Sequence, residues 1–265
     1  MASNSSDRAG KLPFEGRHAV VTGAGRGIGA AIADRLAAGG ATLSLTGRGR
    51  EAIERRAESL PGAIAVSMDV TDPTSVEEGF TAIVERHGPV DILVNNAGAA
   101  ESARFIDSDD ALWQRMLAVN LLGPRACIGA VLPSMLDRGR GRIITVASTA
   151  GLKGYAYTTA YCAAKHAAVG LTRALALETA RTGVTINAVC PGFTDTDLVA
   201  DSVAKIERQT GRTKEQALKE LTRFNPQGRL IDPAEVAAAV AYLCSDEAAG
   251  MTGQALAIAG GEVLS

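Results

Sequence analysis

The sequence predicts an α/β fold in which helices cover both faces of a doubly wound parallel sheet of about seven strands. Short β-branched runs alternate with helical periods along the chain, and a glycine-rich turn joins the first strand to the first helix. No second core, internal repeat or low-complexity block interrupts this alternation. We therefore expect one domain over residues 14–265, after a flexible polar tail at residues 1–13.

The composition excludes several classes of function. The 265 residues carry a net charge of −2 without a basic stripe, which argues against nucleic acid as a partner. No apolar run reaches ~18 residues, so we expect no membrane span. Three isolated histidines and four scattered cysteines suggest no metal site and are typical of a cytoplasmic protein with buried free thiols. The cysteines are Cys127, Cys162, Cys190 and Cys244.

The first strand is expected at residues 17–22, because the run RHAVVT is rich in β-branched residues. It enters the glycine-rich stretch Gly23 to Gly29, and a helix at residues 28–38 follows. This is the context of a phosphate-binding loop, since glycines let the backbone approach an anion that the helix N-terminus favours. A purely structural turn is the alternative. The predicted phosphate-binding residues are Gly23, Arg26, Gly27, Ile28 and Gly29.

The second strand, at residues 41–46, ends where a dinucleotide-binding fold contacts the adenosine ribose. An acidic residue there would bind a 2′-hydroxyl, whereas an arginine accommodates a 2′-phosphate. Residues 41–50 contain no acid, and Arg48 follows the strand, with Arg26 as a second candidate cation. We therefore expect NADP(H), with NAD(H) possible, and a solvated basic turn as the alternative.

The third and fourth strands, at residues 63–67 and 90–94, end in further candidate cofactor contacts. Asp69, next to Val70, lies where it either contacts the adenine or caps a turn. Asn95 and Asn96 precede Ala97 and Gly98, and asparagine side chains there can lock strand carbonyls and leave Gly98 free for a close cofactor approach. Helices are expected at residues 51–60 and 72–87, the second with Asp72 as N-cap.

The central helices surround a polar residue in an apolar setting. A helix at residues 108–119 reaches Asn120, and the helical pattern resumes beyond Gly123 and Pro124 as far as residue 136. A buried amide needs partners, so Asn120 is either a site residue or part of a core hydrogen-bond network. The fifth strand, at residues 141–147, then ends at Ser148.

Tyr161 and Lys165 lie four residues apart in a helix that runs through residue 178, so they share one helix face. Ionising a phenol of pKa near ~10 at neutral pH costs about 4 kcal/mol. A cation ~5 Å away, at an effective dielectric constant of about 20, supplies on the order of 3 kcal/mol. Lys165 would therefore need help from a second cation, and a solvated helix face is the alternative.

The last part of the chain supplies the end of the sheet and a covering segment. A strand at residues 184–189 leads to Pro191, Gly192 and Thr194. Residues 193–226 are polar and helix-prone around Gly211, which is typical of a substrate-covering lid. A helix at residues 232–244 and a strand at residues 254–258 complete the alternation.

With these motifs in order, the chain resembles the short-chain dehydrogenase/reductase family from about residue 15 to 262. The motifs are Thr22-Gly-Ala-Gly-Arg-Gly-Ile-Gly29, Asn95-Asn-Ala-Gly98, Asn120, Ser148, Tyr161-Cys-Ala-Ala-Lys165 and Pro191-Gly192. The resemblance implies a Rossmann fold and a catalytic tetrad of Asn120, Ser148, Tyr161 and Lys165. Tyr161 would be the proton donor and acceptor, Ser148 would bind the carbonyl oxygen, Lys165 would lower the Tyr161 pKa and hold the ribose, and Asn120 would hold a water.

Residues 180–193 resemble 3-oxoacyl-carrier-protein reductases and polyketide ketoreductases, which implies an NADP(H)-dependent reductase of a 3-oxoacyl thioester or related ketone. The alternatives are an NAD-dependent hydroxyacyl-CoA or cyclic-alcohol dehydrogenase and, more remotely, a non-catalytic cofactor-binding protein. The resemblance also implies a homotetramer. A stripe of small residues on the Tyr161 helix fits an oligomer or packing on the sheet: Ala163, Ala167, Gly170 and Ala174.

Overall fold

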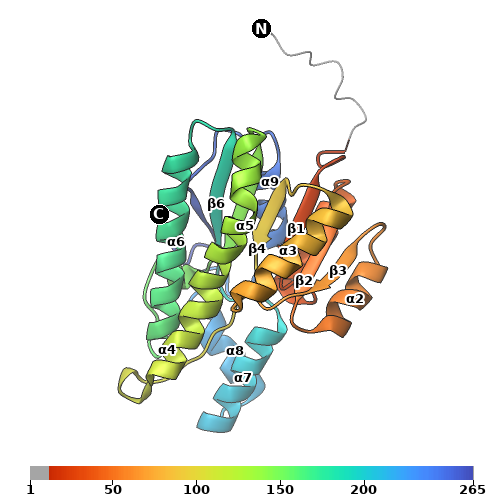
Figure 1. Cartoon of the computed structure of the whole chain (residues 1–265). Coiled ribbons are helices and arrows are strands. Elements are labelled where there is room, and N and C mark those ends of the chain that lie inside the picture. The colour runs from red at the N-terminus through yellow and green to blue at the C-terminus, as the bar shows by residue number, and fades with distance from the viewer. Residues whose placement is uncertain (1–11, 265) are drawn as a thin grey trace.

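The computed structural model describes residues 12–264, and eleven of the thirteen residues of the predicted tail lie outside this range. Its centre is a parallel sheet in the order β3-β2-β1-β4-β5-β6-β7, which confirms the predicted fold class (Figure 1). The strands are β1 (His18–Thr22), β2 (Thr42–Gly47), β3 (Ile64–Ser67), β4 (Ile92–Asn95), β5 (Gly141–Val146), β6 (Val184–Pro191) and β7 (Ala255–Ile258).

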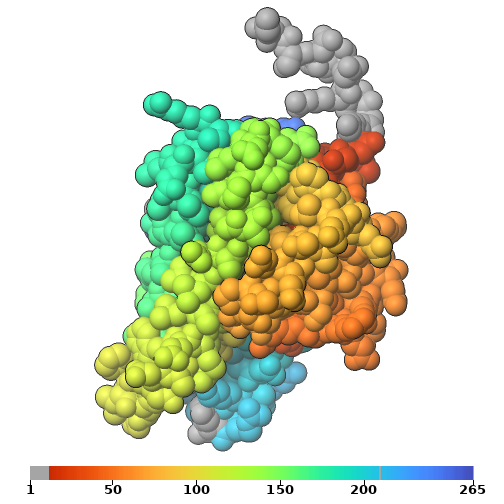
Figure 2. Space-filling model, in the orientation of Figure 1, coloured from red at the N-terminus to blue at the C-terminus, as the bar shows by residue number. Residues whose placement is uncertain are grey.

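The strand order reverses between β1 and β4, which is the position where doubly wound sheets bind ligands. Helices cover both faces of the sheet (Figure 1). One face carries α1 (Gly27–Ala38), α2 (Arg50–Glu58) and α9 (Pro233–Cys244). The other carries α3 (Pro73–His87), α4 (Asp110–Leu117), α5 (Gly123–Asp137) and α6 (Thr159–Thr179), which Figure 2 shows from outside.

Two hydrophobic clusters lie between the sheet and these helices because successive strand residues point to opposite faces. Val20 packs in the cluster with α3 and α5, whereas Val21 packs in the cluster with α1 and α9. The strands β1, β4, β5 and β6 are buried along their whole length. Burial of every residue, polar ones included, is expected of a sheet that is covered on both sides.

The helix caps follow the sequence, whereas the break predicted after Asn120 is wrong. Asp72 accepts a hydrogen bond from the Thr74 backbone, as an N-cap does. Residues Ala118–Leu122 form a π-helical turn, η2, that joins α4 directly to α5. Gly123 permits this continuity, since a Cβ there would lie 2.9 Å from Val70 Cγ2. Such π-turns occur frequently at functional sites.

The segment between β6 and α9 forms a small helical unit of its own. It contains α7 (Asp197–Thr210) and α8 (Lys214–Thr222), and Gly211 ends α7 in the left-handed conformation with φ 68°. The two helices lie beyond the end of the sheet (Figure 1). Their shared core is buried and contacts Phe193: Val199, Val203, Ala217 and Leu221.

One stretch, Asp110–Asp137, has the length and apolar composition that a membrane-crossing helix needs. It comprises α4, η2 and α5, and it contains Arg125 and the buried Asn120. Its apolar residues include Cys127 and Val131, which pack in the core against the sheet. A helix in the core of a globular protein meets the same criterion, so this stretch is weak evidence for a membrane span.

Candidate active site

The predicted site residues lie along the edge formed by the carboxyl ends of the parallel strands. At the centre of this edge, the loop between β1 and α1 approaches the end of β4. Gly23 has φ 65°, and a Cβ on it would lie 2.9 Å from Ala97 Cα. The positive φ and this close approach both require glycine at position 23.

Asn96 holds the glycine-rich loop against β4. Its side-chain amide donates to the backbone oxygens of Thr22, at 2.9 Å, and Gly23, at 3.0 Å. In return, the Thr22 hydroxyl accepts hydrogen bonds from the backbone N–H groups of Asn96 and Ala97. These bonds join segments that are 74 residues apart in the chain, at the point where the strand order reverses.

The predicted lock by an asparagine side chain is confirmed for Asn96, whereas Asn95 takes no part in it. Asn95 is the last residue of β4, and its side chain is buried inside the sheet. Neither of its amide atoms has a hydrogen-bond partner within residues 12–264. Asn96, the next residue, makes the contacts with strand carbonyls that were expected of the asparagines in this motif. Any contact between Asn95 and a cofactor would therefore have to come from its backbone.

The N-terminus of α1 fits an anion. Arg26, the N-cap residue, makes no side-chain capping bond, and the first turn contains no acid. The first backbone N–H groups of a helix point outwards and favour negative charge. Gly29 keeps this turn compact, because a Cβ there would lie 2.3 Å from the Gly23 oxygen and 2.4 Å from the Asn96 amide nitrogen. These features suit a phosphate group.

Two arginines flank this anion-binding turn. Arg48 follows β2, is exposed, and is close enough to act on Asp69. Partial burial would raise the pKa of Asp69, but hydrogen bonds from Thr71 and the charge of Arg48 lower it. Arg26 is also exposed and pairs with Asp197, at the start of α7, at 3.1 Å. The first residues of the predicted lid thus contact the glycine-rich loop.

Lys165 and Asn120 meet around Gly98. A Cβ on Gly98 would lie 3.0 Å from Asn120 Oδ1 and 3.6 Å from Lys165 Nζ. The π-turn places the Asn120 amide so that Nδ2 donates to the backbone oxygens of Ala99 and Met116, at 2.9 and 3.0 Å. Asn120 Oδ1 is buried without a donor among the described residues. A free acceptor facing an ammonium group is the arrangement expected for a bound water.

Lys165 is 5% exposed, and its Nζ donates to the Val146 oxygen at 2.9 Å. Burial lowers the pKa of Lys165 to about 8, and its Nζ lies 5.7 Å from the centre of the Tyr161 ring. The ammonium group therefore stays charged at neutral pH, beside the ring as predicted, but close to the pH at which it loses its proton.

The expected low pKa of Tyr161 is wrong for the protein alone. Burial raises the pKa of Tyr161 to about 12, although a hydrogen bond to the Ser148 side chain acts in the opposite direction. Desolvation of the phenolate outweighs this hydrogen bond. Ser148 Oγ accepts from the Ala150 backbone N–H at 3.1 Å, which leaves its own hydrogen free to donate. Tyr161 is thus poised to hold a proton, and Ser148 to donate a hydrogen bond.

The remaining predicted residues border the same edge. Pro191 is buried at the end of β6, and Gly192, which follows it, donates its backbone N–H to the Ile258 oxygen. Thr194 forms an isolated parallel β-bridge with Ile231. This bridge joins the two ends of the helical segment between β6 and α9. Sequence reasoning did not place Asn96 among the site residues, although it belongs to the quoted Asn-Asn-Ala-Gly motif. It also missed Cys190, whose thiol lies near Tyr161 and Lys165.

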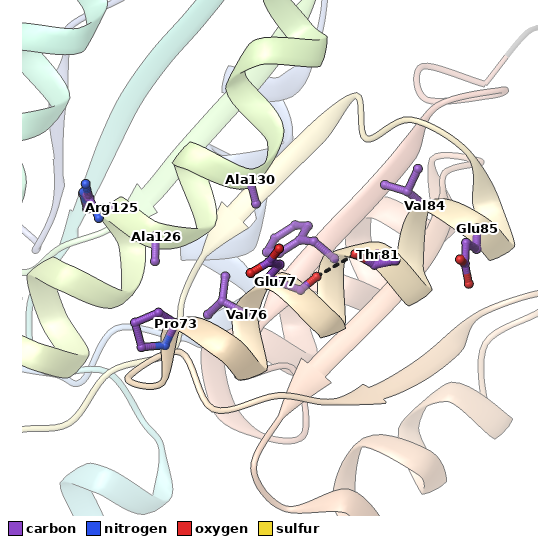
Figure 3. Close-up of a pocket in the computed structure, with 10 residues that line it drawn as sticks. Pro73, Val76, Glu77, Thr81, Val84, Glu85, Arg125, Ala126 and Ala130 are labelled. Carbon is purple, nitrogen blue, oxygen red and sulfur yellow. Dashed lines mark hydrogen bonds between the residues drawn. The ribbon is translucent and has the colours of Figure 1, made fainter.

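A separate groove lies between α3 and α5, the helices that cover one face of the sheet (Figure 3). Its volume is about 550 Å³, and none of the predicted catalytic or cofactor-binding residues lines it. Its walls are mixed in character, with Phe80 and Val84 beside Glu77, Glu85 and Arg125. Among residues 12–264, no three His, Cys, Asp or Glu side chains lie close enough together to hold a metal ion.

Comparison with known proteins decides the family. The family model of the short chain dehydrogenases matches residues 17–207. The chain belongs to the short chain dehydrogenase family. Its members are oxidoreductases that interconvert alcohol and carbonyl groups, so the protein is an enzyme of this class.

Individual relatives align over nearly the whole chain. A protein of Streptomyces violaceoruber, assigned by its name to the granaticin polyketide synthase as a ketoacyl reductase, is 42% identical over 92% of both chains. The 3-oxoacyl-[acyl-carrier-protein] reductase of Vibrio cholerae is 39% identical over 94% of this chain and 98% of its own. The D-beta-hydroxybutyrate dehydrogenase of Rhizobium meliloti is 37% identical over 92% and 97%.

A solved structure has the same fold. A tryptophan variant of actinorhodin polyketide ketoreductase, crystallised with NADPH, superposes with a TM-score of 0.90 at 40% identity. The match covers 93% of this chain and 97% of the ketoreductase. The predicted likeness to polyketide ketoreductases and 3-oxoacyl-carrier-protein reductases is confirmed.

Proposed function

We propose that this short chain dehydrogenase is an NADPH-dependent ketoreductase whose substrate is a 3-oxoacyl thioester or a related ketone. The observation that carries the proposal is the meeting of Asn120, Ser148, Tyr161 and Lys165 at the strand edge, beside the uncapped end of α1. The printed identities of a 3-oxoacyl reductase and an NADPH-bound ketoreductase among the similar proteins support the substrate class and the cofactor.

The residues around α1 fit a dinucleotide. The free N–H groups at its start would bind the pyrophosphate, and Gly23, Gly27 and Gly29 would let the backbone approach it. Arg48 would hold the 2′-phosphate of NADP(H), with Arg26 beside it. The predicted contacts around the rest of the cofactor are Ile28, Asp69, Val70, Asn95, Ala97, Gly98, Pro191, Gly192 and Thr194.

The catalytic residues divide the chemistry at the carbonyl group. The bound nicotinamide supplies hydride for reduction of a ketone and accepts it in the reverse direction. The Tyr161 hydroxyl gives its proton to the carbonyl oxygen, which suits a phenol whose burial keeps it protonated. Ser148 donates a hydrogen bond to the same oxygen as negative charge develops there.

Lys165 and Asn120 return the proton. The Lys165 ammonium group, beside the Tyr161 ring, stabilises the tyrosinate that forms, and it would also hold the ribose of the bound cofactor. Asn120 Oδ1 would hold a water against Lys165 and connect it with solvent. Because the pKa of Lys165 is about 8, the lysine can release and regain a proton near neutral pH.

A panel of ketones tests this function. Purified protein is mixed with 3-oxoacyl thioesters, cyclic ketones and aryl ketones, and oxidation of NADPH and of NADH is followed by absorbance. We expect turnover of at least one class with a KM for NADPH well below that for NADH. Arg48→Ala should raise the KM for NADPH selectively. Equal use of both cofactors by the wild type would overturn the cofactor assignment.

A specific relative favours a second candidate function. The likeness to D-beta-hydroxybutyrate dehydrogenase fits an NAD-dependent dehydrogenase that oxidises a hydroxyacyl substrate. The same panel run in the oxidative direction, with 3-hydroxyacids and cyclic alcohols, separates the two. Faster oxidation with NAD than reduction with NADPH would establish the dehydrogenase. Binding of NADPH without turnover of any compound would contradict both candidate substrate classes and favour the non-catalytic alternative.

We further propose a cytoplasmic homotetramer that closes its site with residues 193–226. The four cysteines are buried and free, which suits a reducing compartment.

Gly170 on α6 and Gly129 on α5 have open space where a Cβ would project, and Leu177 on α6 is 81% exposed. Ala163 and Ala174 are exposed beside them, and Ala167 is half-buried. A small-residue face of this kind suits close packing of helices from another subunit.

A further inference from the structure

A buried carboxylate lies next to the catalytic residues without belonging to the predicted site. Glu262, near the C-terminus, has a side chain that is 1% exposed. Its Oε1 accepts a hydrogen bond from the Tyr155 hydroxyl and pairs with Lys153 Nζ at 3.0 Å. Thr149 completes this network, since its hydroxyl lies 2.6 Å from the Tyr155 oxygen. We call Thr149, Lys153, Tyr155 and Glu262 the Glu262 network.

The two carboxylate oxygens of Glu262 differ in their hydrogen-bond partners. Oε1 has both the lysine and the tyrosine as donors, whereas Oε2 is buried with no donor among residues 12–264. Buried carboxylate oxygens are nearly always hydrogen-bonded, because removal from water is costly for a charged acceptor. Oε2 is therefore suited to a donor that comes from outside the described chain.

The free oxygen faces the catalytic edge. A Cβ on Gly192 would lie 3.0 Å from Glu262 Oε2, and Gly192 directly follows Pro191 at the carboxyl end of β6. The other end of the network is Thr149, the residue after Ser148. Oε2 thus lies between the segment that carries Ser148 and the first residues of the predicted lid.

Aromatic rings cluster around Tyr155, whose hydroxyl donates to Oε1 of Glu262. The centroid of Tyr155 lies 6.2 Å from that of Phe193 and 5.7 Å from that of Phe224, both in edge-to-face geometry. Phe193 and Phe224 stack with centroids 6.0 Å apart. They stand at the start and the end of the predicted lid, and Lys153 Nζ lies 4.9 Å from the Tyr155 centroid. Planar rings with one free acceptor suit a ring-bearing ligand with one donor.

The charge of the network selects the kind of donor. Lys153 neutralises Glu262 at 3.0 Å and is only 34% exposed. A ligand cation would meet the Lys153 ammonium group as well as the carboxylate, and would be repelled by it. A neutral donor meets no such cost, so a hydroxyl group fits Oε2 better than an amine.

We propose that Glu262 determines substrate specificity by accepting, at Oε2, a hydrogen bond from a hydroxyl group on a cyclic ketone. The proposal rests on the proposed ketoreductase function and names the substrate class of that site. The ketone carbonyl is bound by Ser148 and Tyr161, and the ring carries its hydroxyl towards Gly192. Glu262 is then a specificity residue that contacts the substrate, whereas Tyr155 and Lys153 position it.

The test compares matched substrates. Values of kcat/KM with NADPH are measured for 1-tetralone and for its 5-, 6- and 7-hydroxy, methyl and methoxy derivatives. We expect the wild type to prefer the hydroxyl over the methyl compound by about tenfold for at least one ring position, as sites built around a hydrogen bond do. The ratio of two kcat/KM values measured on one preparation does not depend on the fraction of the protein that is folded.

Glu262→Gln supplies the decisive variant. The Gln oxygen must accept from Tyr155 and Lys153, so its NH2 group takes the place of Oε2 and donates instead of accepting. The wild type should also prefer the hydroxyl over the methoxy compound, because a methoxy group cannot donate to Oε2. In Glu262→Gln this ratio of kcat/KM values at that ring position should fall to about one. Glu247→Gln is the matched control, because it makes the same substitution at an exposed glutamate that lies after α9 and outside the Glu262 network. This control should keep the wild-type preference.

Gly192→Ala tests the same oxygen if the Gln variant fails to fold. Its added Cβ, 3.0 Å from Oε2, narrows the space in front of the carboxylate and should reduce the hydroxyl preference while Glu262 remains. Equal turnover of hydroxyl and methyl compounds by the wild type would overturn the proposal and leave the ketoreductase function standing. An unchanged preference in both variants would also overturn it. Failure to reduce any ketone would overturn the proposed function itself, and this inference with it.

Discussion

At the residue scale, burial sets the protonation of the catalytic pair more strongly than their mutual attraction. Burial raises the pKa of Tyr161 to about 12 and lowers that of Lys165 to about 8, so the lysine loses its proton first as the pH rises. A simple estimate of Coulomb attraction between the two predicts the opposite tendency for the tyrosine. The difference is the cost of placing a phenolate away from water.

The pKa of Lys165 predicts an alkaline limit for ketone reduction. The ammonium group stabilises the tyrosinate that forms, so kcat/KM should be constant below pH 7 and fall by at least about tenfold as Lys165 deprotonates above a pKa of about 8. The measurement is kcat/KM for the ketone at saturating NADPH from pH 6 to 10. In Lys165→Arg, residual activity should persist to higher pH, since arginine stays charged. A wild-type profile without a fall below pH 9.5 would contradict this role.

At the element scale, the glycine-rich loop depends on β4 for its shape. Asn96 is the only residue in the described chain whose side-chain amide donates to both Thr22 and Gly23. This contact holds the loop, with its positive φ at Gly23, against the end of β4.

Two neighbouring asparagines provide a matched prediction. Asn96→Leu removes two hydrogen bonds and leaves carbonyls without donors, so it should lower the free energy of unfolding by about 2–4 kcal/mol. Asn95→Leu removes an amide with no partner among the described residues, so stability should stay unchanged or rise. Urea denaturation of both variants measures the difference. Equal losses of stability in the two variants would contradict the assignment of the lock to Asn96.

The elements show what could be predicted from sequence. Strands and capped helices were predictable because β-branched runs and residues such as Asp72 act locally. The choice between Asn95 and Asn96 was not, since adjacent residues point to opposite sides and only the packed sheet decides which side carries the loop. The continuous path through η2 depends equally on packing of Gly123 against Val70.

The candidate site, too, was predictable only where the signal in the sequence is local. Motif residues such as Ser148 and Tyr161 were predictable because the chain resembles a known family, whose motifs match one strand end and one helix of this sequence. The Glu262 network was not, because Tyr155 and Glu262 are 107 residues apart and neither stands in a recognisable pattern. Contacts across such a separation emerge only when the whole sheet is assembled.

At the scale of the whole molecule, a polar network lies at the opposite end of the sheet from the catalytic edge. Buried His18 lies 2.8 Å from the Ser44 hydroxyl, which lies 3.2 Å from His87 Nδ1. The other nitrogen of His18 lies 2.9 Å from the Gly88 oxygen, so the neutral ring is satisfied on both sides. Burial is the main cause that lowers the pKa of both histidines.

These histidines predict a loss of stability in acid. A lowered pKa means that the unfolded chain binds the proton more readily, so the stabilising contribution is complete above the ordinary value of 6.5 and is lost as the pH falls below it. The melting temperature should drop between pH 7 and 5. His18→Asn keeps a donor towards Gly88, and should melt lower at pH 7 but change less on acidification. A wild type and variant with parallel pH dependence would contradict this explanation.

The proposed tetramer is tested on the face of α5 and α6. Gly170→Arg fills the open space on α6 and should convert the assembly to smaller species, measured by size-exclusion chromatography with light scattering. Gly250→Arg is the matched control, because Gly250 also has nothing within 4 Å but lies after α9. An unchanged mass in Gly170→Arg would argue against this face as the interface.

The central claim is that Tyr161 delivers the proton in NADPH-dependent ketone reduction. It is tested most directly with Tyr161→Phe, by measuring NADPH oxidation with the best ketone of the panel and the Kd for NADPH in the same preparation. The account predicts a loss of turnover of at least about 10³-fold, with a Kd for NADPH within severalfold of the wild-type value. Near-normal turnover in Tyr161→Phe would contradict it.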